Sequence, residues 1–169
     1  MNLSYKELLP AGFSGQSRVW VYQSSRLFTL TEALAIEEIL EDFAKNWKSH
    51  STPVKGFGTL FFGQFIILIA DETSTGVSGC STDSSVRVVK EIETAFKVNM
   101  FDRTNLAFVV KDKVQLIPMA QLNYAIDNGF IGPETLFFDN NITNLDLLES
   151  KWILPIKDSW LAKRILKTV

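Results

Sequence analysis

Phe65-Ile66-Ile67-Leu68-Ile69-Ala70 decides the fold of this chain. Its six residues are all apolar, whereas a strand with one face in water alternates apolar and polar residues. The run therefore predicts a central strand that is covered on both faces. The stretch 54–62 precedes it and has the composition of a second strand. Gly63-Gln64 lies between the two, so we expect a hairpin with a two-residue turn.

Further elements are predicted on either side of this hairpin. Arg18-Val19-Trp20-Val21-Tyr22-Gln23 is rich in β-branched and aromatic residues and predicts the first strand. Apolar residues at spacings of three and four then predict a helix that is capped by Thr29 or Thr31 and runs to residue 47. The same spacing predicts another helix from residue 82 or 83 to residue 96, with Asp83 as its cap.

The C-terminal half carries shorter patterns. Its predicted elements are a hairpin of strands at 106–110 and 114–117, a helix at 118–128, a strand at 135–138, a helix at 144–152 and a terminal helix at 158–166 that Asp158 caps. Strands in adjacent pairs with helices between them indicate the α+β class. We expect a single domain over residues 1–169, with a largely antiparallel or mixed sheet packed with about four to five helices.

Charge and composition exclude several classes of function. The 17 Lys and Arg against 19 Asp and Glu give a net charge of −2, without the basic stripe that a nucleic-acid backbone requires. No apolar run approaches the roughly 20 residues that cross a bilayer, and no secretory signal pattern opens the chain. The single cysteine forms no internal disulfide, which fits a reducing compartment. We therefore expect a cytoplasmic protein with no nucleic-acid partner and no membrane insertion.

Residues 78–85, Ser-Gly-Cys-Ser-Thr-Asp-Ser-Ser, are the strongest candidate for a binding site. A loop of small residues here leads into a predicted helix, whose first N–H groups and dipole favour an anion. Capping explains one or two of these polar side chains but not five in succession. We expect a small anionic ligand in a polar pocket at 79–87. The predicted ligand-binding residues are Cys80, Ser81, Asp83, Ser84, Ser85, Arg18, Arg87 and Arg103.

Cys80 also has an interpretation as a nucleophile, because a helix N-terminus lowers the pKa of a thiol. The usual base is scarce, since His50 is the only histidine and is predicted to lie in a surface loop. A buried, unreactive thiol is the stronger interpretation. The sequence therefore assigns no catalytic residue and leaves open whether the protein is an enzyme.

The three arginines of the candidate site stand among apolar or small residues, unlike most of the lysines. We expect them to be partly buried. Such an arginine more often pairs with a structural carboxylate than with a ligand. Asp102 is a candidate partner for its neighbour Arg103 or for another arginine.

The end of the central strand, Asp71-Glu72, is similar to the second nucleotide-binding motif of ATPases, in which carboxylates hold Mg²⁺. No Gly-x-x-x-x-Gly-Lys-[Ser/Thr] phosphate loop accompanies it, so ATP hydrolysis is not expected. A site for a hard cation would need Asp71, Asp83 and Asp102 to converge, which their spacing does not establish. The sequence assigns no metal ligand and identifies no cofactor.

Four segments carry a family resemblance: residues 18–24 (RVWVYQS), 78–86 (SGCSTDSSV), 101–103 (FDR) and 157–160 (KDSW). Together they resemble an uncharacterised bacterial family of similar length whose members are often labelled "ABC transporter ATPase". The resemblance spans nearly the whole chain. An ABC ATPase also needs a Leu-Ser-Gly-Gly-Gln signature, and this chain has only Leu-Phe-Phe-Gly-Gln at 60–64. The resemblance therefore implies no catalytic residue.

Two functions from different classes remain open. The first is a small-ligand or anion-binding domain built on residues 79–87 and the three arginines. The second is a non-catalytic interaction or scaffold protein that binds a partner or a second copy of itself through exposed aromatic side chains. Trp160 and Phe137-Phe138 are the candidates for that surface.

Overall fold

The computed structural model describes residues 1–49, 51–71 and 79–165, with residues 79–81 and 165 described by their backbone. In chain order, the elements are η1 (Lys6–Leu8), β1 (Arg18–Gln23), α1 (Leu30–Asn46), β2 (Lys48–Ser49), β3 (Thr52–Pro53), β4 (Lys55–Phe61), β5 (Phe65–Asp71), α2 (Gly79–Phe96), β6 (Asn105–Val110), β7 (Lys113–Pro118), η2 (Met119–Gln121), α3 (Leu122–Asp127), β8 (Leu136–Phe138), α4 (Leu145–Lys151), β9 (Ile153–Pro155), η3 (Ile156–Asp158) and α5 (Ala162–Ile165). Within these ranges every strand pair is antiparallel, and the predicted α+β class is confirmed.

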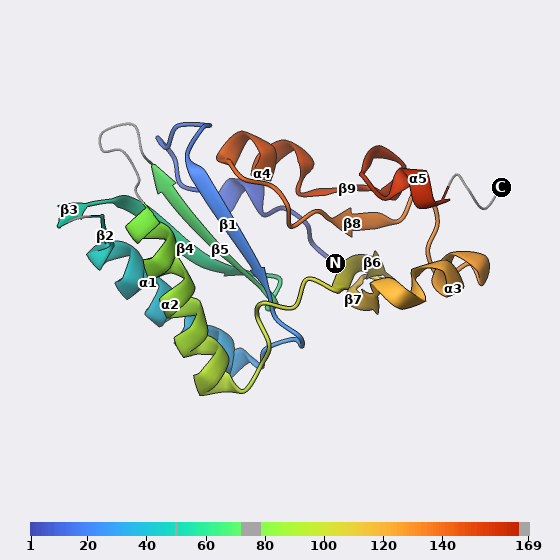
Figure 1. The fold of residues 1–169 in the computed structure, drawn as a ribbon, viewed down its shortest axis with the longest axis horizontal. Helices are drawn as coiled ribbons and strands as arrows, with labels where there is room; N and C mark the ends of the chain where they lie inside the picture. Colours follow the sequence, from blue (N-terminus) through green and yellow to red (C-terminus); the bar gives the residue numbers. More distant parts are fainter. Residues whose placement is uncertain (50, 72–78, 166–169) are drawn as a thin grey trace.

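A three-stranded sheet with the order β1-β5-β4 forms the centre of the fold. All seven residues of β5 are buried, so the prediction of a central strand covered on both faces is confirmed. One face of this sheet carries α1 and α2 (Figure 1). The opposite face packs against α4 and against a second sheet with the order β7-β6-β8-β9, whose far side is covered by α3 and the C-terminal segment.

The β4–β5 hairpin differs from the prediction in its turn. Three residues, 62–64, connect the strands, and Phe62 and Gly63 both have positive φ angles of 54° and 62°. The Gln64 N–H closes the turn on the Phe61 carbonyl oxygen at 3.1 Å. The Gln64 side-chain amide also donates to the Ser24 carbonyl oxygen at 3.1 Å, so the turn is tied to the end of β1.

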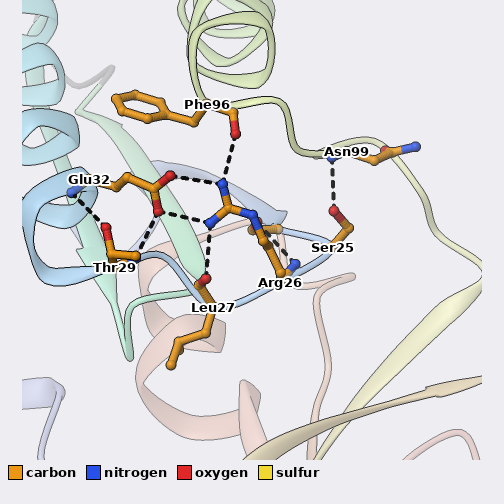
Figure 2. Close-up of polar contacts among 8 residues, drawn as sticks. Ser25, Arg26, Leu27, Thr29, Glu32, Phe96 and Asn99 are labelled. Atoms are coloured by element: carbon orange, nitrogen blue, oxygen red, sulfur yellow. Dashed lines mark hydrogen bonds and ion pairs between the residues drawn. The ribbon is translucent and has the colours of Figure 1, made fainter.

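The start of α1 is fixed by a capping box, as predicted for Thr29. The Thr29 hydroxyl accepts from the Glu32 N–H, and the Glu32 carboxylate accepts from the Thr29 N–H. Figure 2 shows the Arg26 guanidinium bound to both carboxylate oxygens of Glu32 and to the Phe96 carbonyl at the end of α2. These bonds join the β1–α1 loop to both helices.

The start of α2 corrects the sequence prediction. The helix begins at Gly79 rather than at residue 82 or 83, and Asp83 lies exposed inside it instead of capping it. The polar cluster therefore forms the first turns of the helix. The Ser85 hydroxyl donates to the Thr82 carbonyl oxygen at 2.7 Å, a backbone contact that serine makes within helices.

The C-terminal third also departs from the prediction. Asn144 caps α4 by accepting from the Leu147 N–H, but the next segment pairs with β8 as strand β9. Asp158 lies in η3 and is not a cap, because the Ser159 hydroxyl accepts from the Leu161 N–H instead. Residue 166, the predicted end of the last helix, lies outside the described residues. None of the helices in the described ranges is long and apolar enough to cross a bilayer.

Candidate functional site

The structure separates the predicted site residues. Arg18 and Arg103 line one hollow beside β1, whereas Ser84 and Arg87 line another between α1 and α2. Ser85 is buried. The side chains of Cys80 and Ser81 lie outside the described residues, so the nucleophile hypothesis and part of the predicted pocket are untested. His50 also lies outside them.

The hollow beside β1 has a cavity volume of about 510 Å³ and is lined by residues 18–22, Arg103 and residues 140–143. A second hollow of about 430 Å³ continues it and shares Arg103, Asn140 and Asn141. Gln23 and Asn105 line this second part. We call the two hollows together the β1 groove. Its walls come from three segments far apart in the sequence, so local pattern alone does not predict it.

The peptide groups of β1 face this groove at alternate residues. The Val19 N–H donates outward, to the Thr143 carbonyl oxygen at 3.0 Å. Because strand residues alternate in the side to which their peptide groups point, the N–H groups of Val21 and Gln23 point to the same outer edge. No acceptor for either N–H is found among the described residues, and both residues line the groove. Both N–H groups are therefore free to donate to water or to a ligand in the groove.

The two arginines of the groove are exposed, so the expected partial burial is wrong, as it is for Arg87. The Arg18 guanidinium lies over the Trp20 ring at 5.7 Å from its centroid. Arg103 donates through Nη1 to the Asn140 carbonyl oxygen at 3.4 Å, and no carboxylate of a described residue lies within ion-pair distance of it. Arg103 therefore keeps hydrogen-bonding capacity for a ligand.

Asp102 does not pair with Arg103. Its carboxylate accepts from the Thr104 hydroxyl and N–H at 2.6 and 2.7 Å and from the Asn105 amide at 2.6 Å. These hydrogen bonds, led by the Thr104 hydroxyl, hold the pKa of Asp102 below its ordinary value. The expected ion pair is replaced by a local turn, which leaves the guanidinium of Arg103 facing the groove.

Tyr22 connects the groove to the start of α2. Its hydroxyl is 3.2 Å from the Ser85 hydroxyl, and its ring lies edge-on to Phe101. Burial raises the pKa of Tyr22, while the Ser85 hydrogen bond and the charge of Arg103 oppose that rise. Arg103 and Ser85, both predicted site residues, are therefore linked through a tyrosine that sequence reasoning missed.

Asn140 is a second residue that the sequence did not identify. Its side-chain oxygen accepts from the indole N–H of Trp152 at 3.1 Å, and its amide donates to the Gln23 side-chain oxygen at 2.9 Å. It thereby joins β1 to the segment that precedes α4. These two bonds hold Asn140 in the groove wall, where its carbonyl oxygen accepts from Arg103.

The hollow between α1 and α2 has a cavity volume of about 460 Å³ and a mixed lining. Arg87 and Lys48 face it together with the carboxylates of Asp42 and Glu91. Trp47 also lines it, and its indole N–H is buried without an acceptor within the described ranges. Positive and negative groups balance here, so this hollow favours an anion less than the β1 groove does.

The structure places the predicted carboxylates apart. Asp71 is buried and bound to the Lys55 ammonium at 3.2 Å, Asp102 is held by its local turn, and Asp83 lies exposed on α2. Among the residues whose side chains are described, no three His, Cys, Asp or Glu side chains gather as a metal site would require. The similarity of Asp71-Glu72 to a magnesium-binding motif therefore gains no support from Asp71.

No family model, curated protein or solved structure matches this chain. The resemblance to the family labelled "ABC transporter ATPase" stays a prediction, and the site must be argued from its geometry.

Proposed function

We propose that this protein binds a small anionic ligand in the β1 groove, with Arg18 and Arg103 as its main contacts. The observation that carries the proposal is that these two arginines, one at the start of β1 and one in the connection between α2 and β6, line one hollow. The outward N–H groups of Val21 and Gln23 point into the same groove and add uncharged donors. The binding site thus moves from the helix start expected from the sequence to the edge of β1.

The chemistry of the lining indicates a carboxylate or phosphate group. A guanidinium presents a planar fork of N–H donors that matches either anion. Trp20 and Tyr22 belong to the same lining and offer apolar surface for the remainder of the ligand. Because both guanidinium groups are exposed, salt will screen their attraction. We therefore expect affinity to fall as ionic strength rises.

A thermal-shift screen with inorganic phosphate, nucleotides and di- and tricarboxylates tests this proposal. A ligand at about 100 times its Kd adds about 2.7 kcal/mol to stability, which is a shift of several degrees for a domain of this size. The shift should fall to about half or less in Arg103→Ala, as a tenfold or greater loss of affinity requires, and should persist in full in Arg87→Ala, whose arginine lies outside the groove. No stabilisation by any of these anions, or equal loss in both variants, contradicts the proposal.

The alternative, an interaction or scaffold protein, has less support. Phe137 and Phe138 are each only 1% exposed, so their suggested role at a surface is wrong. Trp160 is 43% exposed but lies edge-on to Phe137, with ring centroids 6.0 Å apart. Self-association through Trp160 is retained only as the second proposal. Together with the anion-binding function we propose a cytoplasmic location, since a small metabolite-like anion and a single cysteine both fit that compartment.

A further inference from the structure

The outer edge of β4, on the opposite side of the three-stranded sheet from the β1 groove, is open. The Leu60 N–H points outward and donates to the Glu37 carboxylate at 2.8 Å. Since strand residues alternate, the peptide groups of Gly56 and Gly58 point to the same side. Neither glycine has a backbone or side-chain partner for these groups in the part of the chain that the structure describes. An unpaired edge of this kind is a template for another strand.

A hollow with a cavity volume of about 680 Å³ follows this edge. Its floor is β4 from Gly56 to Thr59, and its wall is the outward face of α1. Leu34, which is 62% exposed, lies at one end of that wall, and Leu30, 77% exposed, lies one helical turn earlier. The hollow therefore combines unpaired peptide groups with exposed apolar surface.

The wall of this hollow is acidic. Its charged lining residues are three carboxylates, Glu37, Glu38 and Glu41, and one cation, Lys45. Lys45 is held by Glu41 at 2.8 Å, and Glu37 is bound to Thr59 and Leu60. Glu38 is exposed and has no partner among the described residues. A strand entering the hollow would meet net negative charge along its length, which favours lysine or arginine side chains.

The closeness of α1 to β4 argues against a second copy of this chain as that strand. A Cβ atom at Gly58 would lie 3.2 Å from the Leu40 carbonyl oxygen, and one at Gly56 3.3 Å from that of Ala44. The helix backbone thus lies directly over the edge strand. Paired strands are about 4.8 Å apart, whereas packed helices need about 8–10 Å. Two copies joined antiparallel through β4 would carry both α1 helices on the same face and bring them into collision, whereas a strand without a helix would not.

We propose that the outer edge of β4 binds an extended basic segment of a partner protein, which adds as a strand to the sheet. Its backbone bonds to the peptide groups of Gly56 and Gly58, as in other cases of strand addition. Its apolar side chains contact Leu34, and its lysine or arginine side chains lie against Glu38 and Glu41. This inference is independent of the ligand proposed for the β1 groove.

Amide hydrogen exchange by NMR tests this directly, with short synthetic peptides of repeated Val-Lys units and repeated Val-Glu units as probes. The Val-Lys peptide should bind saturably and slow exchange at Gly56 and Gly58, while the Val-Glu peptide should not. A double variant, Glu38→Lys with Glu41→Lys, reverses the charge of two residues in the hollow. It should bind the Val-Lys peptide about tenfold or more weakly. Glu149→Lys, an exposed change on α4, is the matched control and should bind like the unmodified protein.

Several results would overturn the inference. These are no saturable binding at millimolar peptide, equal binding of both peptides, and protection that appears elsewhere, for example at the exposed Tyr124 and Phe130. Light scattering that shows a dimer lost on a Gly58→Pro change would assign the edge to a second copy instead. Circular dichroism of each variant confirms that a lost interaction does not come from unfolding.

Discussion

Replacing Asn140 with alanine should destabilise the fold and disturb the β1 groove together. The change removes the acceptor for the indole N–H of Trp152, which is fully buried, and the donor to the side chain of Gln23, which is 8% exposed. A buried polar group that loses its partner costs about 1–3 kcal/mol. Two such groups give an expected loss of about 2–4 kcal/mol, at the lower end of the summed range because the Gln23 side chain keeps its bond to the Asn105 carbonyl oxygen.

Urea and thermal denaturation measure this loss. For a domain of 150–250 residues, 1 kcal/mol corresponds to about 2–4 °C in melting temperature, so the shift should be roughly 5–15 °C. Asn141→Ala is the matched control, since Asn141 is exposed and, among the described residues, its side chain bonds only to Asp139, two residues earlier. Its effect should stay within about 0.5 kcal/mol. A loss below about 0.5 kcal/mol for Asn140→Ala, or equal losses in both variants, would refute the reasoning.

Three further predictions concern other parts of the fold. The Arg26 guanidinium, with Thr29, lowers the pKa of Glu32 to about 2 from its ordinary 4.5, so the stability it supplies is present above about pH 4.5 and is lost as pH falls towards 2. The melting temperature of the unmodified protein should therefore drop more steeply over that range than that of Glu32→Gln, and parallel curves would show that the Arg26 contact adds nothing. Leu68→Ala, at a fully buried position of β5, should cost about 2–5 kcal/mol in chemical denaturation, and a cost under about 1 kcal/mol would mean that the sheet is not the core we describe. Trp160→Ala should leave the molecular mass in light scattering unchanged, whereas a dimer that this change dissociates would favour the interaction protein.

The parts of the fold that the sequence predicted are those with a local signal. An apolar run with no polar face identified β5, and the Thr29 cap with the three-and-four spacing identified α1, because both patterns depend on residues that are neighbours in the chain. The start of α2 was misplaced for a related reason. Small hydroxyl residues fit equally well before a helix and in its first turns, and the Ser85 contact with Tyr22 favours the second arrangement only in the folded protein.

The candidate site depended on distant contacts, which explains its partial success. Arg18 and Arg103 were identified as site residues, but their shared hollow is also lined by residues 140–143, and Asn140 of this segment bonds to Gln23 of β1. Nothing local in the sequence marks Asn140 or the outward N–H groups of Val21 and Gln23. Asp102 was assigned to the wrong partner because its hydrogen bonds with Thr104 and Asn105 form a turn, which satisfies the carboxylate without an arginine.

The central claim is that Arg18 and Arg103 bind one anion together. Isothermal titration of the unmodified protein, Arg18→Ala, Arg103→Ala and the double variant with the tightest anion of the screen measures their coupling. If both contact one ligand, each single change should weaken binding by about tenfold or more, the two effects should not be additive, and affinity should fall with salt. Binding that survives in the double variant, or that only Arg87→Ala removes, would contradict the claim.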